Sequence, residues 1–436
     1  NWVDSDDLFR AENKNLFDQF DREYYESVCE EWISDILDKN PTYFGVSLLS
    51  SRSHRSTEYL LSRLKQRAPH IKTILGGPYA LYLLRGQFSL NRYVDYLFAG
   101  DAENSVKNFA EKNRGYPGIN SLAKPLGDLD EIPLPSYDKD TFSLFDELNS
   151  NKMVYVTGSR GCVRNCSFCC VRNQWPKFQF RSAESIVKEI ERNVVVHGRR
   201  LVRFTDSLVN GSPSLYRKMC LALSELLEKN SMSHEFRWRG QFICRPKKLM
   251  PEKDFEMTKR SNGEMLFIGI ESGSEDVRKH MGKHITNEDI RYTFEQLHRY
   301  EVGAGLLLLV GYPTETEKDF QETIDLIKYF LDKGYFDTQS NGHRTIVSVS
   351  TGPTMQIIKG TPVFKQIDQL GINYNNEYDW VYKNNNFATR KDRYERLTQF
   401  LIDNNIEGGG GNKRRGKVIA AQSSNVASKI IGPPQA

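Results

Sequence analysis

The stretch of the chain that decides the fold is Gly161-Cys162-Val163-Arg164-Asn165-Cys166-Ser167-Phe168-Cys169. Its three cysteines have the spacing C-x3-C-x2-C, directly after a predicted strand. Short spacers can bring three thiolates to one metal cluster, and a [4Fe–4S] cluster ordinarily takes four Cys ligands. Three protein ligands leave one iron open to a substrate or a cofactor. We therefore expect Cys162, Cys166 and Cys169 to bind a [4Fe–4S] cluster.

Two simpler explanations are a structural zinc site and chance clustering. A zinc site typically pairs C-x2-C with a distant second pair, and no such pair follows here. Chance does not explain the position of the loop after a strand. Cys170 is expected to be an ordinary thiol, while Cys29, Cys220 and Cys244 lie in helix or strand patterns and are expected to be buried as small hydrophobes.

Composition limits the class of protein. The 436 residues suit two or three domains, and a hydrophobic content of 39% excludes disorder along the whole chain. The 60 Lys+Arg and 56 Asp+Glu residues leave a net charge of +4, which argues against a dedicated nucleic-acid binder. No apolar run approaches the ~18–20 residues of a membrane span. We expect a cytoplasmic protein without a membrane or nucleic-acid partner.

The first part of the chain alternates strands with helices, which predicts βαβ units and a parallel sheet. Residues 1–40 are predicted to be helical, with an apolar stripe of Tyr24, Val28, Trp32 and Ile36. The proline-rich stretch 113–150 is predicted to be a linker. The expected strands are 43–49, 71–75 and 94–99, and the expected helices are 57–67 and 103–112.

A second alternation follows the linker and predicts a parallel barrel or partial barrel, in which the chemistry lies at the carboxyl ends of the strands. Its expected strands are 152–157, 200–205, 235–242, 264–270, 303–311 and 345–350, and its clearest helices are 182–196, 214–229 and 316–333. The expected domains are 1–112 with a possible truncation at its start, linker 113–150, barrel 151–350, a mixed helical region 351–405 and a flexible tail 406–436.

The cysteine motif after the first strand of a six-unit barrel resembles the radical SAM superfamily. This resemblance implies that the open iron binds the amino and carboxylate groups of S-adenosylmethionine (SAM), whose reductive cleavage yields a 5′-deoxyadenosyl radical. It also implies an electron donor such as flavodoxin or ferredoxin. Phe168 matches the family's usual aromatic residue, and Arg239 in the third strand resembles its usual basic position facing the barrel.

Further pieces of the barrel resemble the family's SAM pocket. Asp206 ends the second strand, where the family often has paired acids for the methionine amine; a helix-capping role is the alternative. Glu271 and Ser272, after the fourth strand, resemble the segment that contacts the ribose. Gly311 begins a turn similar to G-x-P-G-E-T on the adenine side, although Thr314 replaces the second glycine. An ordinary strand-to-helix turn is the alternative for Gly311.

The first domain resembles the Rossmann-like module that binds cobalamin in relatives of this kind. Ligands of doubly wound sheets bind at the carboxyl ends of the strands, and small residues there let a flat corrin approach the backbone. No D-x-H-x-x-G is present, so His54 and His70 are not expected to ligate cobalt. The resemblance implies a cobalamin site at Ser50, Ser51, Gly76, Gly77, Gly100 and Asp101.

The predicted fold class is therefore α/β, with an N-terminal Rossmann-like domain of the cobalamin-binding type, a partial (β/α)6 TIM-type radical SAM barrel and a small C-terminal region. The resemblance implies cobalamin-dependent methyl transfer to an unactivated carbon of a small molecule or peptide. One alternative is a non-methylating radical reaction, such as cyclisation, rearrangement or epimerisation, with the first domain as scaffold. The other is a non-catalytic iron–sulfur or zinc protein. Trp175, Phe178 and the region after Ser350 are expected to select the substrate.

Overall fold

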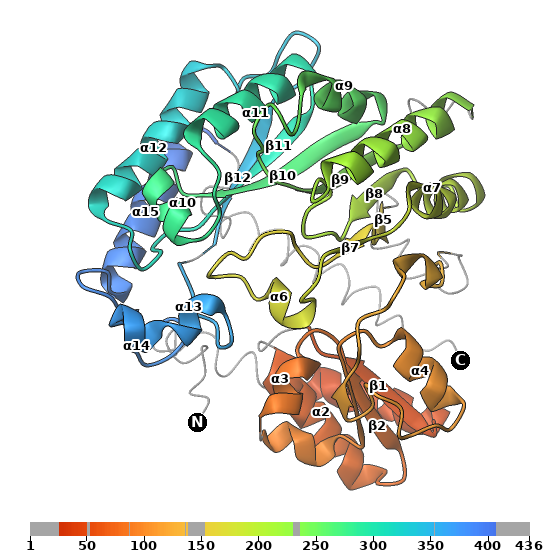
Figure 1. Cartoon of the computed structure of the whole chain (residues 1–436). Coiled ribbons are helices and arrows are strands. Elements are labelled where there is room, and N and C mark those ends of the chain that lie inside the picture. The colour runs from red at the N-terminus through yellow and green to blue at the C-terminus, as the bar shows by residue number, and fades with distance from the viewer. Residues whose placement is uncertain are drawn as a thin grey trace, which may run out of the picture. The chain divides into compact units, whose positions relative to one another are not determined.

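The computed structural model describes residues 26–49, 53–86, 88–135, 137, 153–229, 236–352 and 354–406. It divides into two compact units (Figure 1). Unit 1 comprises Asn1–Pro135, Arg160–Cys162 and Cys170–Arg181, and unit 2 comprises Ser136–Ser159, Val163–Cys169 and Ser182–Ala436. The cysteine stretch thus passes from one unit to the other and back.

Unit 1 contains a four-stranded parallel sheet in the order β1-β2-β3-β4. Its hydrophobic core joins the sheet to its helices through Leu61, Leu75 and Leu83. The unit reaches Pro135, beyond the expected boundary at 112, because β4 adds to the sheet from within the predicted linker. The strands are β1 (Tyr43–Ser47), β2 (Lys72–Gly76), β3 (Tyr96–Ala99) and β4 (Ser121–Leu122), and the helices are α2 (His54–Arg67), α3 (Ala80–Arg85) and α4 (Glu103–Ala110).

The predicted apolar stripe of the first helix is wrong in its phase. Residues 26–39 are helical. Ile36 of the predicted stripe is buried, but Trp32 is exposed, and Tyr24 lies outside the described residues. The other buried positions are Cys29 and Ile33. At 100° per residue, each step of four residues turns about 40° past a full turn. A stripe with a strict spacing of four therefore leaves the buried face, whereas mixed steps of four and three stay on it.

Unit 2 is built on a six-stranded parallel sheet in the order β12-β11-β10-β9-β8-β5, with helices along its outer face (Figure 1). The predicted α/β class and partial barrel are confirmed. The strands are β5 (Met153–Val156), β8 (Leu201–Phe204), β9 (Arg237–Phe242), β10 (Gly263–Glu271), β11 (Gly303–Leu308) and β12 (Ile346–Thr351). The helices are α7 (Ala183–Glu191), α8 (Pro213–Lys229), α9 (Glu252–Arg260), α10 (Glu275–His280), α11 (Asn287–Arg299) and α12 (Glu317–Asp332).

Alternation along the strands decides which side chains face the helices. Phe204 of β8 and Trp238 of β9 are buried on the outer face, and Tyr216 of α8 packs on Trp238 with ring centroids 6.3 Å apart. The intervening residues therefore face the inside of the partial barrel. There, Arg203 and Gln241 are only partly buried.

The C-terminal region belongs to unit 2 and contains a small hairpin and a long helix. Trp380 in the hairpin is buried, and Arg390 stacks on it at 3.7 Å from the ring centroid. The elements are α13 (Pro362–Lys365), α14 (Ile367–Leu370), β13 (Asn373–Tyr374), β14 (Trp380–Val381) and α15 (Phe387–Asp403). The predicted flexible tail lies outside the described residues from 407 onward.

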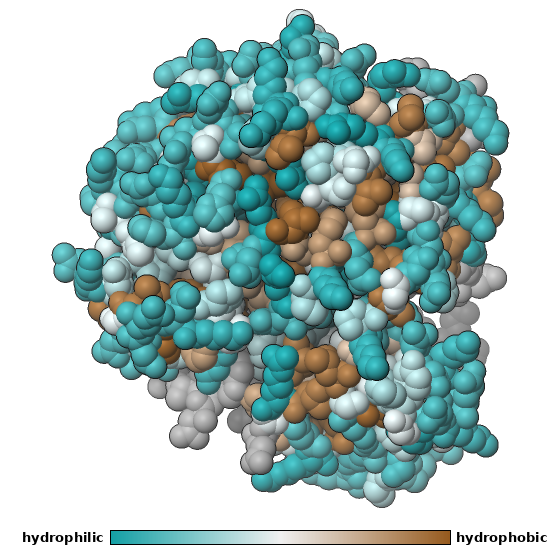
Figure 2. Space-filling model, viewed as in Figure 1, coloured by the Kyte–Doolittle hydropathy of each residue, from teal (hydrophilic) through white to brown (hydrophobic). Residues whose placement is uncertain are grey.

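The visible surface is mostly hydrophilic, with hydrophobic side chains exposed in separate patches (Figure 2). Among the described residues, no helix is both long enough and apolar enough to cross a bilayer.

Candidate functional site

The middle of the cysteine stretch is held by main-chain hydrogen bonds within unit 2. The Ser167 N–H donates to the Met281 carbonyl at 2.8 Å, and the Ser167 carbonyl accepts from the Val363 N–H at 2.9 Å. The Cys169 N–H donates to the Cys166 carbonyl at 3.1 Å, which closes a turn between two of the predicted ligands. The path of this loop is thus set by neighbours rather than by the cysteines alone.

Two further residues form the wall behind this loop. The Tyr312 hydroxyl donates to the His280 carbonyl at 2.9 Å and lies 2.8 Å from the Ser167 hydroxyl. Gly282 has φ +70°, and a Cβ there would lie 3.2 Å from the Asn165 carbonyl oxygen. A side chain at Gly282 would therefore press on the loop that carries the cysteines.

The three predicted ligands are partly buried, and none of the seven cysteines forms a disulfide. Cys162 belongs to unit 1, while Cys166 and Cys169 belong to unit 2. Within the described ranges, no three Cys, His, Asp or Glu side chains are gathered closely enough to hold a metal ion. Metal binding itself organises such sites, so the protein supplies an accessible, supported loop whose thiols a cluster would draw together.

Phe168 has a packing role in this structure. Its ring lies against a hydrophobic cluster in unit 2 that includes Met281, Tyr312 and Trp380. The residue before the third cysteine therefore anchors the loop to the C-terminal region.

Within unit 1, Asp101 fixes the segment that leads to Cys162. Its carboxylate pairs with Arg160 at 3.0 Å and accepts from the Trp175 indole N–H at 2.9 Å and the Leu126 N–H at 3.0 Å. Arg160 also pairs with Glu103; burial alone raises the pKa of Glu103, but this guanidinium lowers it below the ordinary value. Asp101 and Trp175, expected at a cobalamin and a substrate site, are thus partners of each other.

The glycines of the expected cobalamin edge are in contact with their own unit. Gly77 has φ +92°, and a Cβ there would lie 2.7 Å from the Leu48 carbonyl oxygen. Gly100 has φ +88° and its Cβ would lie 3.2 Å from the Ala123 carbonyl oxygen, whereas Gly76 has only ordinary contacts at 3.8 Å. Ser50 and Ser51 lie outside the described residues. Internal packing therefore accounts for Gly77 and Gly100.

Asp206 is buried at the end of β8, as expected for its position. The Gly158 N–H donates to its Oδ2 at 2.8 Å, and a Cβ on Gly158 would lie 3.0 Å from Oδ1. This carboxylate ties the end of β8 to the loop after β5, which continues into the cysteine stretch.

Glu271 and Lys283 form a buried ion pair with 2.6 Å between Oε1 and Nζ. Burial alone lowers the pKa of Lys283, but Glu271 and Cys166 raise it above the ordinary value. Glu271 has φ +69°, a conformation that costs a non-glycine residue ~1–3 kcal/mol. Gly269 makes room for the pair, since a Cβ there would lie 2.5 Å from the Glu271 carboxylate and 2.9 Å from Lys283 Nζ.

The sequence analysis missed Lys283, because a single lysine in a loop has no pattern to reveal it. Only the fold brings it against Glu271 and near Cys166. Its side chain is 8% exposed, which is rare for lysine. Lys283 therefore joins the expected SAM residue Glu271 to the cysteine loop.

Ser272 and Gly311 have internal partners that the resemblance did not predict. Ser272 is fully buried, and its hydroxyl accepts from the Ser274 N–H at 3.1 Å. The Gly311 N–H donates to Glu315 Oε2 at 2.9 Å, and a Cβ on Gly311 would lie 2.5 Å from the Arg390 side chain. Both residues shape turns at the carboxyl ends of their strands.

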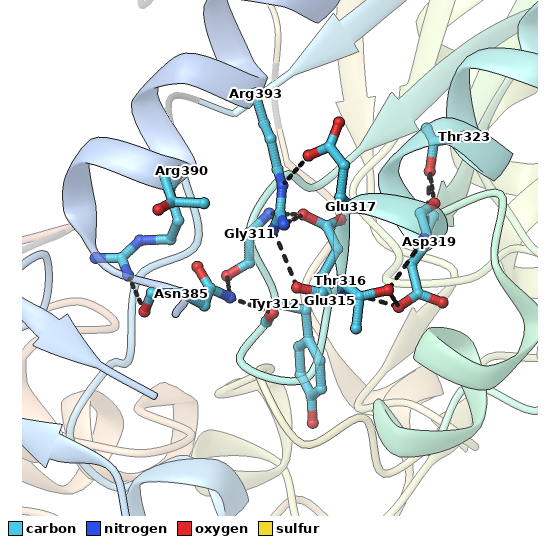
Figure 3. A network of polar contacts seen from close by, with 12 residues as sticks. Gly311, Tyr312, Glu315, Thr316, Glu317, Asp319, Thr323, Asn385, Arg390 and Arg393 are labelled. Atoms are coloured by element: carbon cyan, nitrogen blue, oxygen red, sulfur yellow. Dashed lines mark hydrogen bonds and ion pairs between the residues drawn. The ribbon is translucent and has the colours of Figure 1, made fainter. Parts of the chain in front are cut away.

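The turn after β11 is held by α15 and by Asn385, just before that helix, through buried polar contacts (Figure 3). Arg393 donates to the Glu315 carbonyl at 3.0 Å and pairs with its carboxylate at 3.2 Å, while the Asn385 amide donates to the Tyr312 carbonyl at 2.8 Å. Burial raises the pKa of Glu315 to about 7, although Arg393 and the Gly311 N–H act in the opposite direction.

Comparison with known proteins identifies the central part of the chain. Residues 156–327 match the family model of the radical SAM superfamily. The chain carries a radical SAM domain. The matched residues include the cysteine loop, Glu271 and Lys283, together with strands β8, β9, β10 and β11 of the partial barrel.

One curated relative and two solved structures extend the comparison. The ribosomal protein uS12 methylthiotransferase RimO of Pseudothermotoga lettingae is 29% identical over 204 residues, covering 43% of each chain. The chain therefore spans less than half the length of this relative. The structure of the methyltransferase TsrM of Kitasatospora setae, with cobalamin and a [4Fe–4S] cluster bound, is similar to this chain with a TM-score of 0.63 and 15% sequence identity. The match covers 81% of this chain and 71% of that chain. The cobalamin-dependent SAM radical enzyme OxsB, with aqua-cobalamin and SAM bound, has a TM-score of 0.61, 16% identity and coverage of 79% and 54%.

Proposed function

We propose that the chain is a radical SAM enzyme whose cluster is held by Cys162, Cys166 and Cys169. The observation that carries this proposal is the combination of the cysteine spacing with a loop supported by Met281, Gly282 and Val363 inside a radical SAM domain. When bound, the [4Fe–4S] cluster would deliver one electron to SAM for its cleavage, and a reductant such as flavodoxin or ferredoxin would supply that electron.

In this proposal the Glu271–Lys283 pair forms the polar part of the SAM pocket. The strained backbone of Glu271 and the space left by Gly269 hold the two side chains together away from water. A fixed carboxylate and ammonium can bind the hydroxyl, amino and carboxylate groups of SAM without reorganisation. Asp206 and Gly311 act as positioning residues, because their polar groups already bind Gly158 and Glu315.

We further propose that unit 1 binds cobalamin and that the reaction is methyl transfer to a carbon. The parallel sheet and the structural similarity to TsrM and OxsB support this. Leu49 is 70% exposed at the carboxyl end of β1, which leaves apolar surface for a planar ligand. Cobalamin, when bound, supplies the methyl group; Gly77 and Gly100 support the loops of this edge through their own packing.

Anaerobic reconstitution with iron, sulfide and cobalamin tests the proposal. We expect an iron–sulfur absorbance, uptake of cobalamin, and reductant-dependent formation of both 5′-deoxyadenosine and S-adenosylhomocysteine from SAM. Formation of 5′-deoxyadenosine alone, with no cobalamin bound, would reject methyl transfer and keep the radical SAM chemistry.

Methylthio transfer is the second candidate, because the RimO relative is a methylthiotransferase. Mass spectrometry of the product distinguishes an added methyl group from an added methylthio group. Sulfur in the product would favour this second candidate, and a sulfur-free product would exclude it.

A further inference from the structure

The inner face of the unit 2 sheet carries a polar layer below the Glu271–Lys283 pair. In the strand register, Arg203 of β8 lies beside Tyr155 on one side and Arg239 on the other. Gln241 of β9 lies beside Phe267 of β10. These side chains project away from the helices, into the partial barrel. Through the register, Arg203 and Arg239 are level with Met265, near the amino end of β10.

Phe267 forms a platform for the Arg203 side chain. The guanidinium carbon of Arg203 lies 3.7 Å from the centroid of the Phe267 ring, a cation–π contact. Gly305 of β11 leaves room for this ring. A Cβ on Gly305 would lie 3.0 Å from Phe267 and 3.1 Å from Met265. Phe267 thus lies against the guanidinium of Arg203.

Charge is not balanced at this layer. Glu264 is the neighbouring acid, but Arg239 binds its Oε2 at 2.6 Å and Arg237 binds its Oε1 at 2.7 Å. Within the part of the chain that the structure describes, no carboxylate lies within ion-pair distance of Arg203. Burial and the nearby Arg239 both lower the pKa of Arg203, because each disfavours the positive charge.

The guanidinium of Arg203 is half-buried against Phe267, and its nitrogens are not sealed off from solvent, so they remain available to an anionic ligand. We infer that Arg203 binds a carboxylate group of the substrate on the inner face of the barrel. This inference rests on the proposed function, because it takes the inside of the barrel to be the place where the substrate binds.

The chemistry of the layer favours a carboxylate over a phosphate. A guanidinium edge presents paired N–H donors that match the two oxygens of a carboxylate. A phosphate dianion would need a second unneutralised cation, and Arg239 is already neutralised by Glu264. Phe267, Met265 and the 45% exposed Tyr155 supply apolar surface beside the charge, so the carboxylate would belong to a substrate with an apolar body.

The test uses phenylacetate as the probe and the full reconstituted chain as the protein. Thermal unfolding is measured against phenylacetate concentration at constant ionic strength, with phenylacetamide as the uncharged analogue and inorganic phosphate as the second anion. A ligand that binds only the native state raises the melting temperature by an amount that grows with the logarithm of its concentration relative to Kd. We expect phenylacetate to do so and phenylacetamide not to.

Three variants make the test specific. Arg203→Met should weaken phenylacetate binding roughly 10- to 150-fold, the loss that corresponds to a charge-assisted hydrogen bond. Arg203→Lys keeps the charge without the paired donors and should bind with intermediate affinity. Arg237→Met is the matched control, because Arg237 belongs to the same layer but is 62% exposed and paired with Glu264; it should bind as the wild type does.

Wild-type affinity in Arg203→Met would overturn the inference, and tighter binding of phosphate than of phenylacetate would overturn the assignment to a carboxylate. If Arg203→Met fails to fold, an unchanged affinity in Arg203→Lys serves as the contrary result. The proposed function is judged separately by SAM cleavage in the wild type. If the wild type cleaves no SAM but binds phenylacetate in a way that depends on Arg203, the proposed enzymatic function is rejected and the carboxylate site is retained.

Discussion

The carboxyl ends of the strands in unit 1 and the inner face of the sheet in unit 2 use their polar groups differently. In unit 1, Asp101 binds three partners of its own unit. Atoms of adjacent loops occupy the space that a side chain at Gly77 or Gly100 would need. In unit 2, Arg203 packs on Phe267 and has no anionic partner among the described residues, while Glu271 pairs with Lys283 on a strained backbone.

The difference shows why the position of a residue in a parallel sheet is insufficient to assign it to a ligand. Both regions lie where α/β proteins bind ligands. In unit 1, however, the polar group of Asp101 already makes its hydrogen bonds within the unit. Strain and unmatched charge are costs that a fold retains where they serve a function. By this criterion the evidence for a ligand is stronger in unit 2 than at the glycines of unit 1.

The largest expected effect concerns the cysteine loop, which belongs to both units. Replacing Cys162, Cys166 or Cys169 with Ala should abolish the visible absorbance of the reconstituted cluster, because each thiolate is a proposed ligand. Cys170→Ala is the matched control and should retain it. A cluster that survives in Cys169→Ala and is lost in Cys170→Ala would shift the register of the motif by one residue.

The second prediction tests the structural role of Asp101 in unit 1. Asp101→Ala leaves Arg160 and Trp175 without their buried acceptor and should lower the free energy of unfolding by ~3–5 kcal/mol, as for other broken buried pairs. Urea denaturation measures this. Asp276→Ala, whose ion pair with Lys279 is 78% exposed on the acid side, should change it by ~0–0.5 kcal/mol. Equal effects of the two changes would contradict a structural role for Asp101.

The third prediction tests the strained pair in unit 2. Glu271→Gln should weaken SAM binding roughly 5- to 150-fold, equivalent to ~1–3 kcal/mol, while the cluster absorbance persists. Equilibrium binding of SAM to the reconstituted protein checks it, with Asp276→Asn as an exposed acid that should have no effect. Unchanged affinity in Glu271→Gln would make the Glu271–Lys283 pair a purely structural feature.

The smallest expected effects concern how stability depends on pH, which should have opposite signs for one carboxyl group in unit 1 and one in unit 2. In unit 1, burial alone would raise the pKa of Asp95, but hydrogen bonds from Lys65, Thr73 and Lys72 lower it below the ordinary value. Its folded pKa is depressed, so its contribution to stability is present above the unfolded pKa of ~3.9 and is lost as the pH falls below it. Asp95→Asn should therefore reduce the loss of stability in acid.

In unit 2 the sign is reversed, because burial raises the pKa of Glu315 to about 7. Its contribution is complete below the unfolded pKa of ~4.3 and declines as the pH rises through about 7. Urea unfolding of the wild type and Glu315→Gln, compared between about pH 5 and pH 8, measures this slope. A steeper loss of stability toward pH 8 in Glu315→Gln than in the wild type would contradict the assignment.

The strands of both sheets could be predicted from the sequence, because buried parallel strands are short apolar runs that end at turn residues. The six strands of unit 2 lie within two residues of the predicted starts. Strand β4 and helix α3 were missed for a physical reason. Each is short, and β4 pairs with β3 across a proline-rich stretch in which no local periodicity exists.

Local signals in the sequence are sufficient to propose part of the candidate site. The cysteine spacing and the position of Glu271 can be found in consecutive residues. The partners cannot: Lys283 meets Glu271 through the fold, and Arg203 stands out only because Glu264 is occupied by two other arginines. Ser272 was placed at a ligand by resemblance, whereas its burial follows from tertiary packing against the turn at Ser274.

The ends of the six-stranded sheet have a mechanical consequence. Within the described residues, β5 pairs only with β8 and β12 only with β11, so the ring of strands is not closed by hydrogen bonds. A closed barrel can change its diameter only by breaking or shifting ladders, because strand number and shear fix it. An open sheet can change its curvature through the twist between neighbouring strands. The described six-stranded sheet has this open geometry, so a change in its curvature does not require any of its strand pairs to separate.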